Sequence, residues 1–214
     1  MHRGSIHQGR PILTVGAPLE SALAAMLMVH GRGATAESIL SLADELRQPD
    51  FAYIAPQAAG NVWYPNSFMS PIPSNEPWLS SALATLESVI SHIAEYIPYE
   101  RIMVLGFSQG ACLGLEFVAR HARRYGGVVG LSGGLIGPAG TPRDYIGSFD
   151  GTPVFLGCSD VDSHIPKERV LHTEEVLARM GADVTTRLYP NMGHTINQDE
   201  IDAVKAIMSN ASHA

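Results

Sequence analysis

The chain has 214 residues, of which 45% are hydrophobic and 16% charged, and its formal net charge is −7. This length favours one domain with a full hydrophobic core, and the composition is unlike that of a disordered chain. The negative charge, with no basic cluster to offset it, argues against nucleic-acid binding and favours a metabolite, lipid or protein substrate.

We expect no signal peptide, because the positive charge in residues 1–10 is not followed directly by an apolar core. The most apolar early stretch, 22–29, is too short to span a bilayer. Cys112 and Cys158 give no disulfide framework, and both are expected to be small buried side chains. The expected setting is the reducing cytoplasm without stable membrane insertion, and a homodimer is left open.

The first half of the chain predicts a flexible arm over residues 1–10, followed by a single domain over 11–214. Strands are expected over three short apolar runs, 12–15, 24–29 and 51–55. Thr35 can cap a helix over 36–47. Apolar residues at helical spacing predict a long helix over 78–97.

Residues 57–77 carry no clean period and contain several prolines. A segment this long without structure of its own is often a lid or a pocket wall, although a well-packed surface loop is an equal alternative. Its large apolar side chains, Trp63, Tyr64, Phe68 and Met69, would suit the wall of an apolar substrate pocket.

The second half alternates strands with helices. Strands are expected over 101–105, 127–131, 153–156 and 184–189, the last nearer an edge, and helices over 111–120 and within 165–180. Asn197 and Glu200 form a capping-box pattern for a final helix through 208. This alternation predicts an α/β fold with a mostly parallel sheet, helices on both faces and sites at the carboxyl ends of strands.

The stretch from Gly106 to Gly110, with Ser108 at its centre, lies between a predicted strand and a predicted helix. This is the context of a nucleophile elbow, a sharp turn that exposes a serine. The flanking glycines let the strand and helix approach each other closely. An ordinary glycine-rich turn is the alternative, so the elbow needs support from other residues.

A serine hydroxyl needs a histidine to take its proton and an acid to orient that histidine. His194 follows the last predicted strand, at the carboxyl edge of the sheet. The other downstream histidines are less well placed, since His121 and His172 fall within helices and His213 lies in the terminal tail. His194 is therefore the expected base.

Two aspartates follow the predicted strand over 153–156, and the residues alone leave both Asp160 and Asp162 open as the acid. The unused one is expected to bind a backbone N–H group. A metal site of Asp160, Asp162, His164 and His194 is an alternative, but it would leave the serine elbow without a purpose. No metal or other cofactor is expected.

The tetrahedral oxyanion of acyl transfer needs rigid N–H donors. One candidate is the backbone amide of Gln109, at the start of the helix after the serine. The second is the backbone amide of Arg32, in the glycine-containing loop 30–33 that follows an inner strand.

Four motifs, the loop 30–33, the elbow 106–110, the aspartate before Ile165-Pro166 and the pair Gly193-His194, resemble those of one known family. It is the phospholipase/carboxylesterase family of small α/β-hydrolases, which includes acyl-protein thioesterases and bacterial carboxylesterases. The resemblance covers about residues 12–208 and implies an α/β-hydrolase fold with a minimal cap. It also implies Ser108 as nucleophile, His194 as base and the amides of Arg32 and Gln109 as oxyanion donors.

The family's acid stands four residues before a proline, which selects Asp162. Family members commonly have proline directly after this aspartate, whereas Ser163 follows here, so Asp160 stays the second choice. The expected function is cofactor-free cleavage of small-molecule carboxylic esters with short-to-medium acyl chains. A lysophospholipase, an acyl thioesterase and a catalytically silent binding protein are the alternatives.

Overall fold

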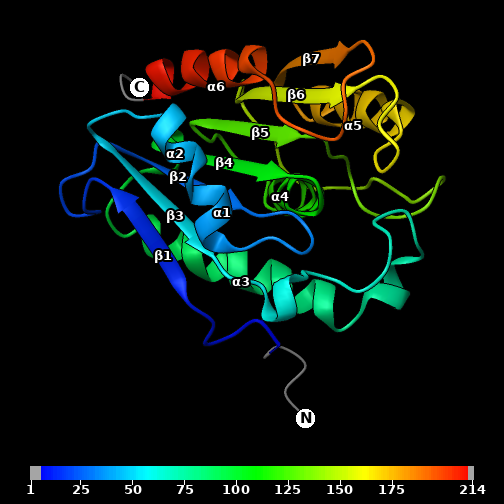
Figure 1. Cartoon of the computed structure of the whole chain (residues 1–214), viewed down its shortest axis with the longest axis horizontal. Coiled ribbons are helices and arrows are strands. Elements are labelled where there is room, and N and C mark those ends of the chain that lie inside the picture. The colour runs from blue at the N-terminus through cyan, green and yellow to red at the C-terminus, as the bar shows by residue number, and fades with distance from the viewer. Residues whose placement is uncertain (1–5, 212–214) are drawn as a thin grey trace.

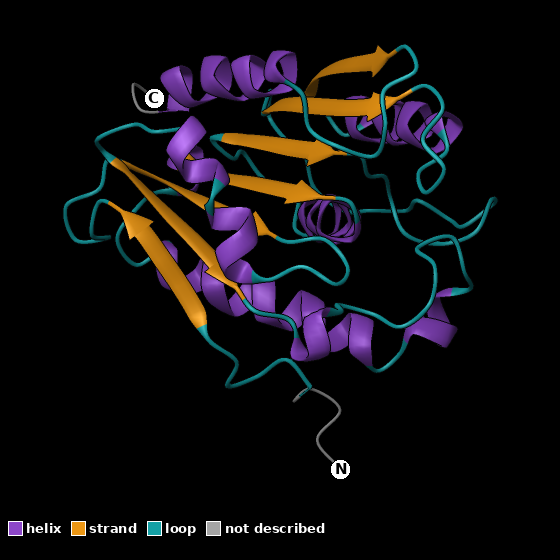
Figure 2. Ribbon diagram, viewed as in Figure 1, coloured by secondary structure: helices purple, strands orange, loops and turns teal. Residues whose placement is uncertain are grey.

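The computed structural model describes residues 6–211 and is built on a seven-stranded sheet (Figures 1 and 2). The strands lie in the order β1-β3-β2-β4-β5-β6-β7, and β1, paired with β3, is the one antiparallel strand of this sheet. Their bounds are β1 (Ile12–Gly16), β2 (Ala24–Val29), β3 (Phe51–Pro56), β4 (Ile102–Phe107), β5 (Gly127–Leu131), β6 (Pro153–Ser159) and β7 (Asp183–Tyr189). The predicted mostly parallel α/β sheet is confirmed.

The burial of each strand follows its place in the sheet. All six residues of β2 are buried, as expected for a parallel strand covered on both faces. β7 alternates between exposed and partly buried residues, and it lies at one edge of the sheet. β1 lies at the other edge and is mostly exposed. The sequence predictions of a strand near an edge over 184–189 and of an inner strand before the loop 30–33 are therefore confirmed.

Six α-helices cover the two faces of the sheet within residues 6–211. They are α1 (Ala36–Leu40), α2 (Leu42–Glu45), α3 (Trp78–Ile93), α4 (Gln109–Arg120), α5 (Lys167–Arg179) and α6 (Gln198–Ala211). Side chains of α3, α4 and α5 share one hydrophobic core with one face of β2, and those of α1, α2 and α6 share a second core with its other face. Short 3₁₀ helices lie at Ala59–Asn61, Ile72–Asn75 and Tyr99–Arg101.

The helix predicted over 36–47 is instead two short helices divided at Ser41. Thr35 caps the first of them, as expected, together with Ser38. The hydroxyls of Ser38 and Ser41 each donate to the carbonyl three residues earlier, which competes with regular helical hydrogen bonding. The long helix predicted to reach residue 97 ends at Ile93, ahead of Pro98, whose ring disfavours helical geometry in the residue before it.

His7 anchors the start of the described chain, so residues 6–10 differ from the flexible arm expected there. The side chain is buried, its Nδ1 accepts from the amide of Ala59 at 3.0 Å, and its Nε2 lies 3.0 Å from the carbonyl oxygen of Trp63. The His7 amide also donates to Ser81 Oγ. The imidazole thus pairs backbone groups that would otherwise be buried without partners. Residues 1–5 of the expected arm lie outside the described residues.

Every predicted catalytic side chain follows a parallel strand. The strands β4 to β7 point the same way, so their carboxyl ends meet at one edge of the sheet (Figure 2). Ser108 follows β4, Asp162 follows β6 and His194 follows β7. Within residues 6–211, no helix combines the length and apolarity needed to cross a membrane.

Candidate active site

Ser108 occupies a strained turn between β4 and α4, with φ 55° and ψ −120°. A Cβ at Gly106 would overlap the backbone of Gly110, and a Cβ at Gly110 would overlap the carbonyls of Val29 and His30. Neither position can therefore hold a side chain unless the backbone moves. The two glycines therefore allow the strands and the helix to approach each other closely, as their spacing predicted.

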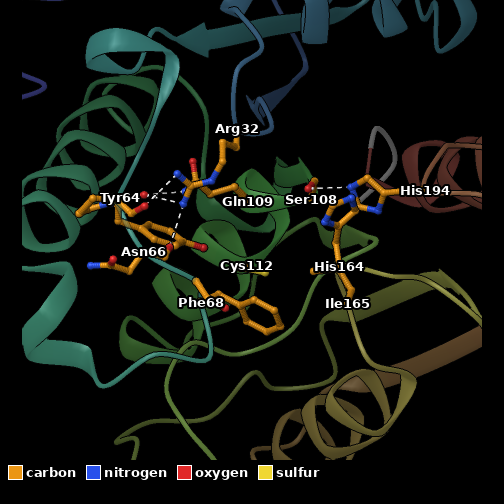
Figure 3. Close-up of a pocket in the computed structure, with 12 residues that line it drawn as sticks. Arg32, Tyr64, Asn66, Phe68, Ser108, Gln109, Cys112, His164, Ile165 and His194 are labelled. Carbon is orange, nitrogen blue, oxygen red and sulfur yellow. Dashed lines mark hydrogen bonds between the residues drawn. The ribbon is translucent and has the colours of Figure 1, made fainter.

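Ser108, His194 and Asp162 form one hydrogen-bonded chain, whose first link is visible in Figure 3. His194 Nε2 lies 2.8 Å from Ser108 Oγ, and His194 Nδ1 lies 2.7 Å from Asp162 Oδ2. The side chain of Asp162 is fully buried, whereas that of His194 is 21% exposed. The imidazole therefore has one nitrogen on the serine hydroxyl and the other on a buried carboxylate.

The Asp162 carboxylate is held at both oxygens. Its Oδ1 accepts from the amides of His164 and Ile165, at 2.8 and 3.0 Å, while Oδ2 faces His194. Burial by itself would raise the pKa of Asp162, but the hydrogen bond with His194 and the two amides outweigh it and leave the pKa below its ordinary value. The carboxylate stays ionised, which favours a proton on Nδ1 of His194.

Asp160, the second-choice acid, has a different partner. Its Oδ1 accepts a 2.8 Å hydrogen bond from the amide of Asn191, in the loop that leads to His194. Asp162 therefore contacts the imidazole of His194, whereas Asp160 binds the loop that carries this histidine. The expectation that the unused aspartate binds a backbone N–H group agrees with this contact.

The backbone amides of Arg32 and Gln109 are free to serve a ligand. Gln109 is the first residue of α4, where an N–H group has no helical acceptor. Neither amide donates to another residue within 6–211. The loop of Arg32 lies against the elbow, because a Cβ at Gly31 would sit 3.4 Å from Ser108 Cβ.

The side chains of Arg32 and Gln109 hold the segment that faces the serine. The Arg32 guanidinium donates to the carbonyls of residues 64, 65 and 66, at 2.8, 3.0 and 2.8 Å (Figure 3). Gln109 Oε1 accepts from the amide of Trp63 at 2.9 Å, and its Nε2 donates to the carbonyl of Tyr64 at 2.8 Å. The sequence predicted a role only for the backbone amides of these two residues. Their side-chain contacts were not predicted, because the partners are backbone groups of a segment without periodicity.

A cavity of about 390 Å³ opens at Ser108. Figure 3 shows Ser108 and His194 on one side of it, with Tyr64, Asn66 and Phe68 on the other. The complete lining is Arg32, Tyr64, Pro65, Asn66, Ser67, Phe68, Ser108, Gln109, Cys112, His164, Ile165 and His194. Cys112 and Ile165 were not predicted to line the cavity, because the sequence does not show which way their side chains point.

Two of the four side chains predicted for this pocket wall are elsewhere, and two line it. Tyr64 and Phe68 line the cavity as expected. Trp63 does not: it is fully buried behind the cavity, and its indole Nε1 donates to the carbonyl of His30 at 2.8 Å. Met69 lines a separate cavity. A segment without periodicity gives no basis for deciding which side chains turn outward.

The residues of the metal alternative have other partners in this structure. The ring of His164 meets the ring of His194 edge-on, with centroids 4.8 Å apart. Across residues 6–211, no group of three or more His, Cys, Asp or Glu side chains is arranged to hold a metal ion.

Glu200 caps α6, in the segment that follows the loop carrying His194. Its Oε2 accepts from the Asn197 amide, and its own amide donates to Asn197 Oδ1, both at 2.9 Å, so the predicted capping box is confirmed. The side chain is fully buried against Gly157, and its Oε1 has no hydrogen-bond partner among the described residues. Burial raises the pKa of Glu200 to about 7.

The chain is similar to known hydrolases along most of its length. The family model described as Phospholipase/Carboxylesterase matches residues 11–212. A crystal structure of a phospholipase/carboxylesterase from Dyadobacter fermentans is 44% identical, with a TM-score of 0.90, over 94% of this chain and 97% of that one. The crystal structure of a Bacillus cereus carboxylesterase has a TM-score of 0.74 at 18% identity, over 95% of each chain, and shows a common fold.

Curated relatives are named acyl-protein thioesterase 1. The Debaryomyces hansenii protein is 26% identical over 92% of this chain and 95% of its own length. The Gibberella zeae protein is 35% identical over 51% of this chain and 47% of its own length. The match therefore spans about half the length of the latter relative.

Proposed function

The chain belongs to the phospholipase/carboxylesterase family of ester-cleaving hydrolases, and on that premise we propose that it is a serine hydrolase with Ser108 as its nucleophile. His194 is the proposed general base and Asp162 the acid that orients it. One observation carries this assignment: a single imidazole lies 2.8 Å from the serine hydroxyl and 2.7 Å from a buried carboxylate.

The proposed reaction has two halves. Ser108 Oγ attacks the ester carbonyl while His194 Nε2 takes the hydroxyl proton, and Asp162 stabilises the imidazolium that forms. His194 then gives this proton to the departing alcohol, leaving an acyl group on Ser108. A water molecule repeats the attack with His194 as base, which releases the carboxylic acid and restores the serine.

The amides of Arg32 and Gln109 are the proposed donors to the tetrahedral oxyanion. Two features support them: neither is paired within residues 6–211, and their side chains are fixed to the segment opposite the serine. The helix dipole of α4 adds to the amide of Gln109. Fixed donors of this kind need no reorganisation as negative charge develops.

We propose carboxylic esters with short-to-medium acyl chains as substrates. The cavity of about 390 Å³ is bordered by Phe68, Ile165 and Cys112, which offer an apolar surface beside the serine. Acyl thioesters are the second candidate, because the relatives from Debaryomyces and Gibberella are named acyl-protein thioesterases. The same triad would cleave either bond.

A fluorophosphonate probe should label the protein at Ser108 and leave Ser108→Ala unlabelled. Matched p-nitrophenyl esters and acyl thioesters of graded chain length then identify the preferred substrate by kcat/KM. Failure of both labelling and turnover would overturn the serine-hydrolase assignment. A chelator should leave turnover unchanged, and a reversible loss on chelation would support a metal-dependent reaction instead.

A further inference from the structure

A second cavity, of about 290 Å³, shares a wall with the first. Phe68 and Ile165 border the first cavity, and their chain neighbours Met69 and Pro166 border the second. We call this second space the Arg169 cavity, after the buried residue at its wall. The segments 68–69 and 165–166 therefore form the wall between the two cavities.

The Arg169 cavity is lined by two guanidinium groups with little exposure to water. Arg169 is 8% exposed, and the side chain of Arg143 is 6% exposed. The buried carboxylate beside them is Glu116, whose side chain is 2% exposed. Glu116 lies 3.6 Å from Arg143 and is already paired with Arg120 at 2.7 Å. The wall therefore carries more buried positive than negative charge.

The positive charge of Arg143 destabilises that of Arg169, while Glu116 partly offsets this effect. Burial and, after it, the positive charge of Arg143 both lower the pKa of Arg169. Arg169 Nη1 donates to the carbonyls of Leu135 and Gly137, at 2.7 and 2.5 Å. Its Nε and Nη2 donate to no residue of the described chain, although the side chain lines the cavity. A guanidinium edge of this kind matches the two oxygens of a carboxylate or phosphate.

We propose that the Arg169 cavity binds the anionic end, a carboxylate or a phosphate, of a substrate whose ester bond lies at Ser108. The inference rests on the proposed function of Ser108 and deepens it, because it adds a charge requirement to the apolar surface beside the serine. Glu168, an exposed residue at the rim, opposes an anion and tunes its affinity.

Kinetics on pairs of esters that match in chain length and differ in charge test the proposal. One set is the p-nitrophenyl monoesters of dicarboxylic acids from glutarate to suberate, each compared with its methyl-capped neutral partner. A second set carries a terminal phosphate on the acyl chain, and a third carries the carboxylate on the alcohol side. At one chain length, kcat/KM should favour the anionic ester over its neutral partner.

Two variants should move this preference in opposite directions. Arg169→Gln should lower the ratio of anionic to neutral kcat/KM by about 10- to 100-fold, as expected for loss of a charged hydrogen bond. Glu168→Gln should raise the ratio by about two- to fivefold, since it removes an exposed like charge. Because Arg169 also holds two carbonyls, its variant is checked by circular dichroism, and Glu168→Gln decides the matter if Arg169→Gln unfolds.

A binding experiment tests the proposed anion site independently of the chemistry at Ser108. Calorimetry on Ser108→Ala should show saturable binding of inorganic phosphate or of adipate, and Glu168→Gln should tighten it. If the anions bind but no ester is turned over by the parent protein, the proposed function fails and only the anion-binding part of the cavity assignment stands. An anionic preference absent at every chain length, together with no saturable binding of either anion, overturns the proposal.

Discussion

The indole Nε1 of Trp63 donates a 2.8 Å hydrogen bond to the carbonyl of His30, and the two rings lie 4.9 Å apart. This contact joins the aperiodic segment 57–77 to the loop that carries the Arg32 amide. His30 is held from the other side as well, since its Nε2 accepts from the amide of Ala58 at 3.1 Å. Trp63 thus supports the proposed oxyanion loop from behind instead of contacting substrate.

Trp63→Phe should destabilise the protein and slow its turnover. The substitution keeps an aromatic ring but leaves the buried carbonyl of His30 unpaired, which costs about 1–3 kcal/mol of unfolding free energy. We expect kcat to fall with little change in KM, because the Arg32 amide loses its fixed position. Urea unfolding and steady-state ester kinetics measure the two effects. Trp78→Phe is the matched control, and an equal loss of kcat in both variants would contradict this role.

Asp162→Asn should abolish most turnover, whereas Asp160→Asn should not. An asparagine at 162 can no longer favour the correct tautomer of His194, and in a serine triad this change lowers kcat by about 10⁴. Asparagine at 160 keeps an oxygen for the Asn191 amide, so its kcat should stay within a few-fold of the parent value. The comparison uses kcat for one p-nitrophenyl ester. A collapse confined to the variant at 160 would reverse the assignment.

The sequence could predict the strands, the elbow and the histidine loop because each leaves a local pattern. An apolar run followed by glycines two residues either side of Ser108 defines both the strand and the turn. His194 could be chosen because it follows the last predicted strand, whereas His121 and His172 fall within predicted helices. The two aspartates could not be separated from the residues themselves, because both follow β6 in the same loop. Only the tertiary contacts show which one faces the imidazole.

The side-chain contacts of the segment over 57–77 were beyond sequence reasoning. Strand and helix periods tell which residues face the core, and this segment has neither period. Trp63 and Met69 therefore could not be distinguished from Tyr64 and Phe68. His7 left no signal at all, because a single polar residue near a terminus does not reveal the backbone groups it pairs.

Gly110→Ala should disrupt the elbow, while Gly114→Ala, one turn later in α4, should be tolerated. A Cβ at 110 would overlap the carbonyls of Val29 and His30, so β2 or α4 must shift. A Cβ at 114 meets only Val104 Cγ1, at 3.3 Å, and alanine favours a helix over glycine by about 1 kcal/mol. Thermal unfolding and fluorophosphonate labelling compare them. A Gly110→Ala protein with parent-like labelling would show that the close approach is unnecessary.

Glu200→Gln should remove a pH-dependent loss of stability. Burial, with a smaller contribution from Asp199, raises the pKa of Glu200 to about 7 despite the amide of Asn197. The negative charge of Glu200 also contributes to raising the pKa of the buried Cys158 thiol. The unfolded chain has the ordinary pKa of 4.5. Between these two values the folded protein holds a proton that the unfolded chain releases, so stability falls as pH rises through the window, by about 3 kcal/mol.

Glutamine at 200 retains an oxygen for the Asn197 amide and thus keeps the capping box, but it has no proton to release. The variant should match the parent protein near pH 4.5 and exceed its unfolding free energy at pH 8, because only the parent must ionise a buried carboxyl. Urea unfolding from pH 4.5 to 8 measures the slope. Asp202→Asn, at an exposed position of the same helix, should keep the parent slope, and the same slope in Glu200→Gln would refute buried titration at this position.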